Sequence, residues 1–217
     1  MNTLTFSRPN MKLRKLAEHL SLPYNRVLSF DLPAGWSCPM ANICKTKANR
    51  ETGKLERFGP VLCYAAKAEA QYPNVRNSRW RNFRELGPHT SEIMRDMLIT
   101  DMPYKAEIIR IHSSGDFFNP AYFEAWRMVA DALPAVKFFG YTKILDYVLA
   151  DKPDNFRLIY SYGSRDDKRW NATIPTCFIK IEASDYPDVP VICDNHDNSY
   201  QDYHEIFAGR SFALNLH

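Results

Sequence analysis

The sequence lacks long apolar runs and a strong charge of either sign. No stretch approaches the roughly 18 apolar residues that a membrane-spanning helix needs, and the chain does not open with an apolar secretion signal. Lys plus Arg (28) nearly balance Asp plus Glu (25), which leaves a formal charge of +3. Composition alone therefore gives no reason to expect a nucleic-acid partner. We expect a cytoplasmic protein without membrane contact, in which any basic surface is local.

Cysteine is scarce, and its number is odd. Five cysteines occur in 217 residues, and three of them fall within one stretch. Small secreted proteins that are held together by disulfides carry a denser and usually even-numbered set. We therefore expect reduced thiols, some of them bound to a metal. The length is sufficient for one domain with a sizeable core.

The three clustered cysteines follow the first predicted strand of the main sheet. Residues 27–30 form a short apolar run that ends in a turn containing Pro and Gly, which is typical of a buried strand. Cys38 and Cys44 come next, with five residues between them, and Cys63 follows a charged insertion at residues 45–62. Ordinary buried cysteines are an alternative, but the polar, proline-containing loop argues against a core strand here.

Three thiolates are one ligand short of the set that a closed zinc site or a fully ligated cluster requires, which leaves two interpretations. Either a fourth ligand comes from elsewhere, such as Cys177, Cys193 or a histidine, or one metal position is open for a substrate or cofactor. Thiolates accept both zinc and iron, so spacing alone does not distinguish the two metals.

Strands and helices alternate along the rest of the chain. Apolar runs predict strands at residues 27–30, 107–112, 136–141, 156–160, 177–181, 189–192 and 211–216. Helical patterns lie at residues 11–20, 64–72, 75–86, 90–99, 119–133 and 144–149. Short connections between such elements favour a parallel sheet. We predict a single α/β domain at residues 25–217 with a partial or compact TIM-barrel-like parallel sheet and flanking helices, after an N-terminal arm and helix at residues 1–24.

Polar residues follow the ends of these strands, where ligands gather in parallel α/β folds. The candidate ligand-binding residues at this rim are Ser113, Ser114, Gly115, Asp116, Thr142, Lys143 and Ser161. Glu182, Cys193 and Asp194 follow later strands. Plain turns and strand-end caps are the alternative, which is slightly favoured for Lys143.

Arginines alternate with aromatic residues in the predicted helix at residues 75–86. Arg76, Arg79, Trp80 and Arg81 form a candidate nucleic-acid surface, because arginine contacts phosphates and aromatic rings stack on bases. Helical spacing favours the alternative, in which the aromatic residues belong to the core.

The histidines give weaker signals. His112 ends an apolar strand, and we expect it to be a hydrogen-bonded core residue. Cys193, His196 and His204 form a candidate second metal site, although their spacing matches no strong signature.

Five motifs together resemble one family. CPMANIC, CYAAKAE, YPNVRNSRWRNF, IRIHSSGDFFNPAYFEAW and FFGYTK resemble the phage gene product 88 family, from about residue 27 to the C-terminus. That family in turn resembles radical S-adenosylmethionine enzymes. In those enzymes a C-x3-C-x2-C motif after the first barrel strand holds a [4Fe-4S] cluster, and a small-residue loop ending in an acid follows the second strand.

This resemblance implies roles for the candidate residues. Cys38, Cys44 and Cys63 would ligate a [4Fe-4S] cluster with one iron open for S-adenosylmethionine. The loop 113–116 would hold the amino group of that cofactor, and Thr142, Lys143 and Ser161 would line the substrate or ribose side. The cysteine spacing is wider than the C-x3-C-x2-C pattern, so the insertion at 45–62 must loop out.

The function implied by the resemblance is a radical S-adenosylmethionine-like enzyme that a phage makes in the host cytoplasm. Such an enzyme needs an electron donor, and its substrate is not readable, with nucleic acids or nucleotides as candidates. Two alternatives remain open. One is a non-catalytic nucleic-acid-binding protein whose insertion is held in place by zinc or a cluster, and the other is a protein that binds a host factor and has lost the radical chemistry.

Overall fold

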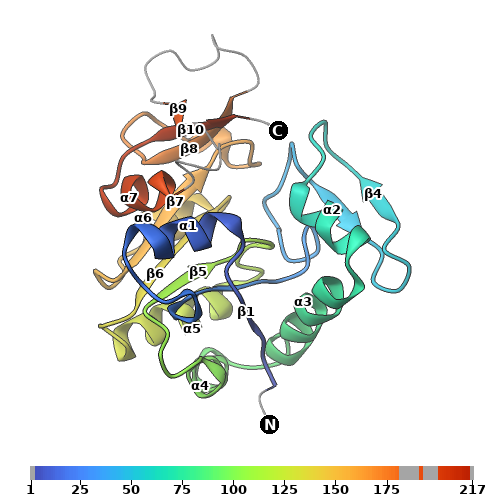
Figure 1. Cartoon of the computed structure of the whole chain (residues 1–217). Helices are drawn as coiled ribbons and strands as arrows, with labels where there is room; N and C mark the ends of the chain where they lie inside the picture. The colour runs from blue at the N-terminus through green and yellow to red at the C-terminus, as the bar shows by residue number, and fades with distance from the viewer. Residues whose placement is uncertain (1–2, 181–190, 193–199, 216–217) are drawn as a thin grey trace.

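The computed structural model describes residues 3–180, 191–192 and 200–215 (Figure 1). These residues form an α/β fold around a mostly parallel sheet. The strands follow the order β1-β2-β5-β6-β7-β8-β10-β9, and β1 pairs antiparallel with β2 whereas the other neighbours are parallel. Their bounds are β1 Phe6–Ser7, β2 Val27–Phe30, β5 Ile108–Ile111, β6 Lys137–Thr142, β7 Phe156–Ser161, β8 Thr176–Lys180, β9 Val191–Ile192 and β10 Phe212–Asn215.

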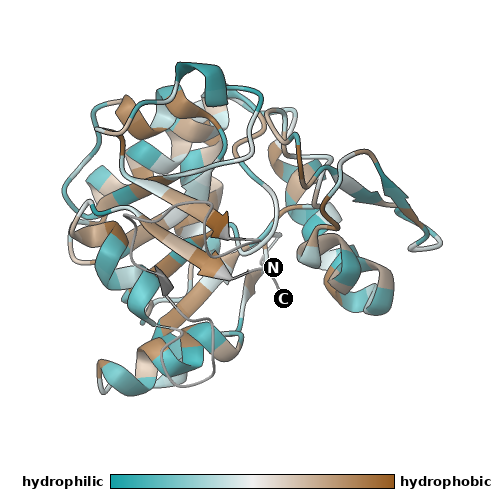
Figure 2. Cartoon of the chain, turned by 90° about the horizontal axis from the view of Figure 1, so that it is seen from above, coloured by the Kyte–Doolittle hydropathy of each residue, from teal (hydrophilic) through white to brown (hydrophobic). Residues whose placement is uncertain are grey.

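Helices cover both faces of this sheet. They are α1 Met11–His19, α2 Tyr64–Gln71, α3 Pro73–Leu86, α4 Ser91–Asp101, α5 Pro120–Ala132, α6 Leu145–Leu149 and α7 Gln201–Phe207. α4 and α5 pack on one face through Leu98 and Trp126, and α1 and α7 pack on the other through Leu16 and Ile206. Because both faces are covered, the central strands β2 and β5 are buried at every position and are mostly apolar (Figure 2).

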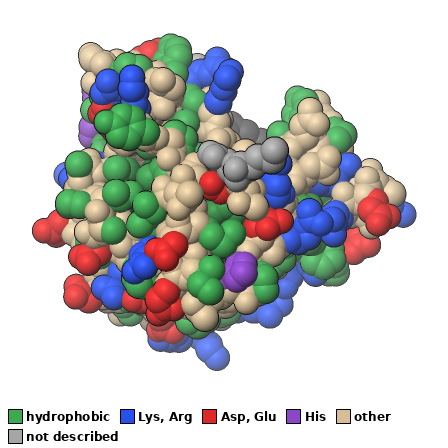
Figure 3. Space-filling view, turned by 90° about the horizontal axis from the view of Figure 1, so that it is seen from below, with side chains coloured by type: hydrophobic (Ala, Val, Ile, Leu, Met, Phe, Trp, Pro, Cys, Tyr) green, Lys and Arg blue, Asp and Glu red, His purple; other side chains and the backbone are tan. Residues whose placement is uncertain are grey.

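A side lobe stands beside the sheet, to the right in Figure 1. It contains α2, α3 and the antiparallel hairpin of β3 (Thr46–Ala48) and β4 (Leu55–Arg57). Seen from below, the surface is hollowed between the sheet and this lobe (Figure 3). The residues of the lobe lie between Cys44 and β5 in the chain. The hairpin is therefore the looped-out insertion that the sequence predicts.

The predicted parallel α/β architecture is confirmed, and the sheet is open. In the described residues β1 and β9 are its two edges, so the strands do not close into a barrel. The sequence did not predict β1, the β3–β4 hairpin or α7, all of which are short elements with few apolar residues. As predicted, two separate helices meet at Pro73: α2 ends at Gln71, and α3 begins at Pro73 itself rather than at residue 75, because the missing N–H of proline costs nothing at the first position of a helix.

No helix within the described ranges is both long and apolar enough to cross a bilayer.

Candidate functional site

The loops after β2 and β5 are joined by hydrogen bonds. The backbone N–H of Leu32 donates to the carbonyl of Ser114 at 2.9 Å, and the Ser114 hydroxyl donates to the carbonyl of Leu32 at 2.9 Å. The Asp31 carboxylate accepts from the Ser114 backbone N–H at 3.1 Å and from the Ser29 hydroxyl at 3.0 Å. This pairing brings the segment that leads to the cysteines against the small-residue loop.

Gly115 allows the closest approach between these loops. Its φ of +91° is unfavourable for other residues, and a Cβ atom here would lie 2.6 Å from the Ser37 hydroxyl oxygen and 2.7 Å from the Leu32 Cβ. The residue next to Cys38 therefore packs directly on Gly115. Only glycine fits this position without displacing its neighbours.

The Asp116 carboxylate connects the β5 loop to the end of β6. It accepts hydrogen bonds from the Thr142 hydroxyl at 2.8 Å, from the Lys143 backbone N–H at 2.9 Å and from the Phe117 backbone N–H at 2.8 Å. Burial raises the pKa of Asp116 to about 6, although these three hydrogen bonds act in the opposite direction. Asp116 is thus an oriented carboxyl group that titrates near neutral pH.

Lys143 connects β6 to β7. Its side chain is 7% exposed, and its ammonium donates to the Ser161 carbonyl at 3.1 Å, the Ser161 hydroxyl at 3.3 Å and the Tyr162 carbonyl at 2.8 Å. The Ser164 hydroxyl donates to the Lys143 carbonyl at 2.6 Å. The predicted rim residues of the three central strands thus lie in one continuous network.

The loop that carries Cys38 and Cys44 docks on the end of β7. The Ile43 backbone N–H donates to the Gly163 carbonyl at 3.2 Å, and Arg165 donates to the Met40 carbonyl at 3.0 Å. Ala41 and Ser164 form an isolated β-bridge. Because the loop starts at β2 and ends at β7, it passes over the carboxyl ends of β5 and β6.

Cys63 returns to this loop at the base of the hairpin. Its backbone N–H donates to the Thr46 hydroxyl at 3.2 Å, and Val61 donates to the carbonyl of Ile43 at 2.9 Å. Tyr64, the next residue, reaches across to donate from its hydroxyl to the Ser113 carbonyl at 2.7 Å. The third cysteine therefore lies beside the first two.

The three clustered thiols affect one another electrostatically. Cys38, Cys44 and Cys63 are free and half-buried. Burial raises the pKa of the Cys38 thiol well above its usual value, and Asp116, Cys63 and Cys44 add to the rise. Burial also raises the pKa of Cys63, again with a contribution from Cys44. Across the described chain, however, no three Cys, His, Asp or Glu side chains are arranged to hold a single metal ion.

The further cysteines and histidines lie apart from these thiols or outside the described residues. Cys177 is buried in the core beneath α1 and α7, where burial raises its pKa to about 12. His204 packs near His19 and Tyr200. Cys193 and His196, like Glu182 and Asp194, lie outside the described residues.

His112 is a core residue, as predicted. It is 4% exposed and its Nε2 lies 3.0 Å from the Tyr122 hydroxyl. Burial lowers its pKa to about 3, so the ring is neutral at physiological pH.

The arginine residues of α3 divide into buried and exposed members. Arg76 and Arg79 are buried, and their guanidinium groups donate to protein acceptors, including the Glu69 carbonyl for Arg76 and the Glu69 carboxylate for Arg79. Arg81 is exposed and donates to the Thr5 hydroxyl. Trp80 packs between Trp36 and Phe83, with ring centroids 5.4 and 5.9 Å away.

Glu69 is a buried residue that the sequence analysis did not single out. One carboxylate oxygen accepts from the Ala34 backbone N–H at 2.8 Å, from Arg79 at 2.9 Å and from the Ser114 hydroxyl at 3.2 Å. The other oxygen is buried without a hydrogen-bond partner. Burial raises the pKa of Glu69, against the effects of Ala34 and Arg79. Glu69 links the side lobe to the rim of the sheet.

The fold and this rim define an α/β protein in which three thiols from residues 38–63 gather above the carboxyl ends of parallel strands. The family model for gene product 88 matches residues 4–203. The chain belongs to the gene product 88 family.

Two curated phage proteins are similar to this chain. The gene 88 protein of Mycobacterium phage L5 is 29% identical over 150 residues, which cover 61% of this chain and 56% of that protein. The gene 88 protein of Mycobacterium phage D29 is 31% identical over 147 residues, which cover 61% and 55%. The chain thus matches just over half the length of these relatives. No solved structure matches the chain.

Proposed function

We propose that this chain is an iron–sulfur enzyme of the radical S-adenosylmethionine type, with a [4Fe-4S] cluster on Cys38, Cys44 and Cys63. The observation that carries the proposal is the convergence of these three thiols beside Asp116, although an 18-residue insertion separates the second thiol from the third. A cluster of soft thiolates is the ligand set that iron–sulfur centres use.

The resemblance to radical S-adenosylmethionine enzymes is the reason to prefer a cluster to a single zinc ion. One zinc ion draws its thiolates to about 2.3 Å from a common centre, and no described trio of donors has such an arrangement. A four-iron cluster places its sulfur ligands further apart because each cysteine binds a different iron. The raised pKa values of Cys38 and Cys63 mean that metal binding must displace their protons.

The rim residues would then position the cofactor. The bound cluster would supply the electron that cleaves S-adenosylmethionine reductively. Gly115 is half-buried and precedes Asp116, whose carboxylate is oriented by Thr142 and Lys143 and has lone pairs left to accept from an ammonium group. Ser113 and Ser114 complete this loop, and Lys143 fixes Ser161 on the neighbouring strand.

Metal and sulfide analysis after anaerobic purification tests the proposal. We expect roughly four irons and four sulfides per chain, with a broad visible absorption. Cys44→Ala should lose this absorption, whereas Cys177→Ala, which removes a thiol in the core, should keep it. One zinc without sulfide, or equal loss in both variants, would refute the cluster.

A further inference from the structure

Arg110 is a buried arginine without a hydrogen-bond partner in the described structure. It is the third residue of β5 and is 7% exposed, and its Nε is fully buried and unbonded. Among the described residues, no acceptor bonds to the guanidinium and no carboxylate lies within the 4.0 Å range of an ion pair. A buried arginine is almost always paired, so its donors call for an explanation.

Four polar side chains lie near this guanidinium: Ser29, Asp31, Tyr141 and Asp202. Together with Arg110 they are called the Arg110 cluster. Ser29 is the register neighbour of Arg110 on β2, and its hydroxyl donates to Asp31. The Tyr141 ring centroid lies 5.0 Å from the guanidinium carbon. The Tyr141 hydroxyl donates to the Asp202 carboxylate on α7 at 2.6 Å.

The cluster keeps the guanidinium charged but leaves its donors unused. Burial works to lower the pKa of Arg110, and Tyr64, Tyr141, Asp202 and Asp31 together raise it by more. The cation–π contact with Tyr141 stabilises the charge. It does not replace hydrogen bonds, and a guanidinium has five N–H donors in a planar fork.

The Arg110 cluster lies next to the rim that carries the thiols. Arg110 lies on β5, and two residues separate it from the loop 113–116 that follows this strand. Tyr64, which follows Cys63, donates to the Ser113 carbonyl and also acts electrostatically on Arg110. Tyr141 packs against the core beneath α1 and α7. The Arg110 cluster therefore occupies this face of the sheet, close to the carboxyl ends of β5 and β6.

We propose that Arg110 binds the carboxylate of a small-molecule ligand at this face of the sheet. A carboxylate matches the planar fork of a guanidinium with two parallel hydrogen bonds. A phosphate dianion fits less well, because Asp31 and Asp202 would repel its second charge. The inference uses no metal and stands independently of the iron–sulfur proposal.

Acetate is the probe for this site, because it is small enough to reach a guanidinium of low exposure. The full chain, labelled with 15N-arginine, is titrated with sodium acetate at constant ionic strength, and chloride is the reference anion. We expect a saturable shift of the Arg110 Nε–H resonance with acetate and a weaker response to inorganic phosphate. The resonance that disappears in Arg110→Lys is assigned to Arg110. Acetate binding to this variant, measured by the rise in unfolding temperature with acetate, should be at least about tenfold weaker.

Arg157→Lys is the matched control. Arg157 lies on β7 and forms an ion pair with Asp154 at 3.0 Å, so its replacement should leave acetate binding unchanged. A response that does not saturate, equal stabilisation of Arg110→Lys by acetate, or tighter binding of phosphate would overturn the proposal. If Arg110→Lys does not fold, the Arg110 Nε–H resonance is assigned in the wild type by through-bond NMR correlation, and its titration decides the question.

Discussion

Asp116 holds a buried carboxyl group among three hydrogen-bond donors, yet its pKa rises from 3.8 to about 6 because burial dominates. A carboxyl group whose pKa is higher in the folded state stabilises the fold below its unfolded pKa, and this contribution is lost as the pH rises through the folded value. The shift corresponds to about 3 kcal/mol.

Asp116→Asn should therefore change how stability depends on pH. The difference in free energy of unfolding between wild type and variant should fall by about 2 kcal/mol between pH 4 and pH 6.5, because only the wild type carries this titration. Urea denaturation across that range measures it. A difference that stays constant with pH would show that Asp116 does not titrate in this window.

At the residue scale the sequence predicted the rim but not its internal contacts. Asp116 and Lys143 were candidates because they follow apolar strands, and strand ends are readable from the apolar pattern. Arg110 was not a candidate, because a lone charged residue within IIRI indicates only a strand. Its missing partners, like the unbonded oxygen of Glu69, appear only once burial and contacts are known.

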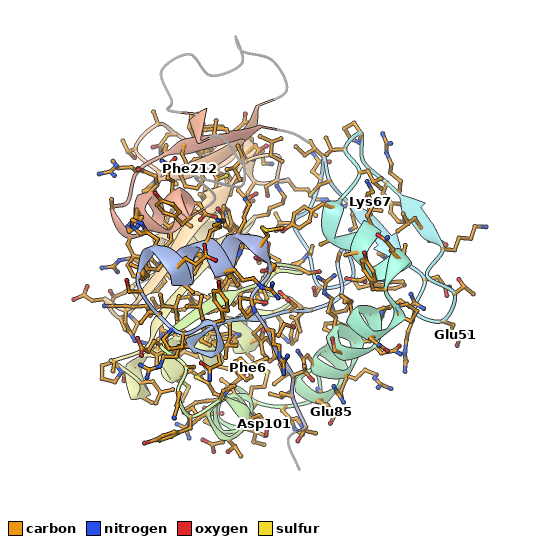
Figure 4. The ribbon with its side chains drawn as sticks, viewed as in Figure 1. Phe6, Glu51, Lys67, Glu85, Asp101 and Phe212 are labelled. Atoms are coloured by element: carbon orange, nitrogen blue, oxygen red, sulfur yellow. The ribbon has the colours of Figure 1, made fainter. Side chains whose placement is uncertain are left out.

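The β3–β4 hairpin is the element that makes the wide cysteine spacing possible. Sequence reasoning required residues 45–62 to loop out but did not predict strands there, since each strand has three residues and little apolar character. Arg76 holds the tip of the hairpin by donating to the carbonyls of Arg50 at 2.9 Å and Glu51 at 3.1 Å. Glu51 lies on the side of the lobe that faces away from the sheet (Figure 4).

Arg76→Met should loosen this tip without moving the cysteines. Both hydrogen bonds that Arg76 donates to the tip are lost, so the Asn49 and Gly53 amides should exchange hydrogen at least about tenfold faster. Hydrogen exchange by mass spectrometry over residues 49–54 measures the change. Arg81→Met, on the exposed side of α3, is the control. Equal exchange in both variants would mean that the hairpin holds its own shape.

At the scale of the whole molecule, Glu69 and Arg79 connect the side lobe to the sheet. Their ion pair measures 2.9 Å, and both side chains are buried. Because Glu69 also accepts from Ala34 and Ser114, this one carboxylate contacts α3 of the lobe and both rim loops.

Arg79→Met should destabilise the fold by about 3–5 kcal/mol, because it leaves a buried carboxylate without its counter-charge. Arg84→Met, an exposed position of the same helix, should change stability by less than about 0.5 kcal/mol. Urea denaturation at pH 7 compares the two. Similar midpoints would indicate that Glu69 is neutral in the native protein.

The parallel α/β architecture was predictable because each central strand is a short apolar run buried on both faces. The open form of the sheet was not predictable from the sequence, because closure depends on which strands become edges. Short edge strands such as β1 have too few residues to show an apolar pattern. The family was predictable because the motifs that resemble it are spread over the chain, and the family model matches residues 4–203.

The docking of the cysteine loop on the end of β7 determines when the thiols assemble during synthesis. Met40 and Ser164, which are bonded across this contact, are 124 positions apart in the chain. A nascent chain that ends before β7 already contains Cys38, Cys44 and Cys63 but lacks the end of β7 on which their loop docks. The thiols are therefore made early in synthesis, and the contact of their loop with β7 forms late.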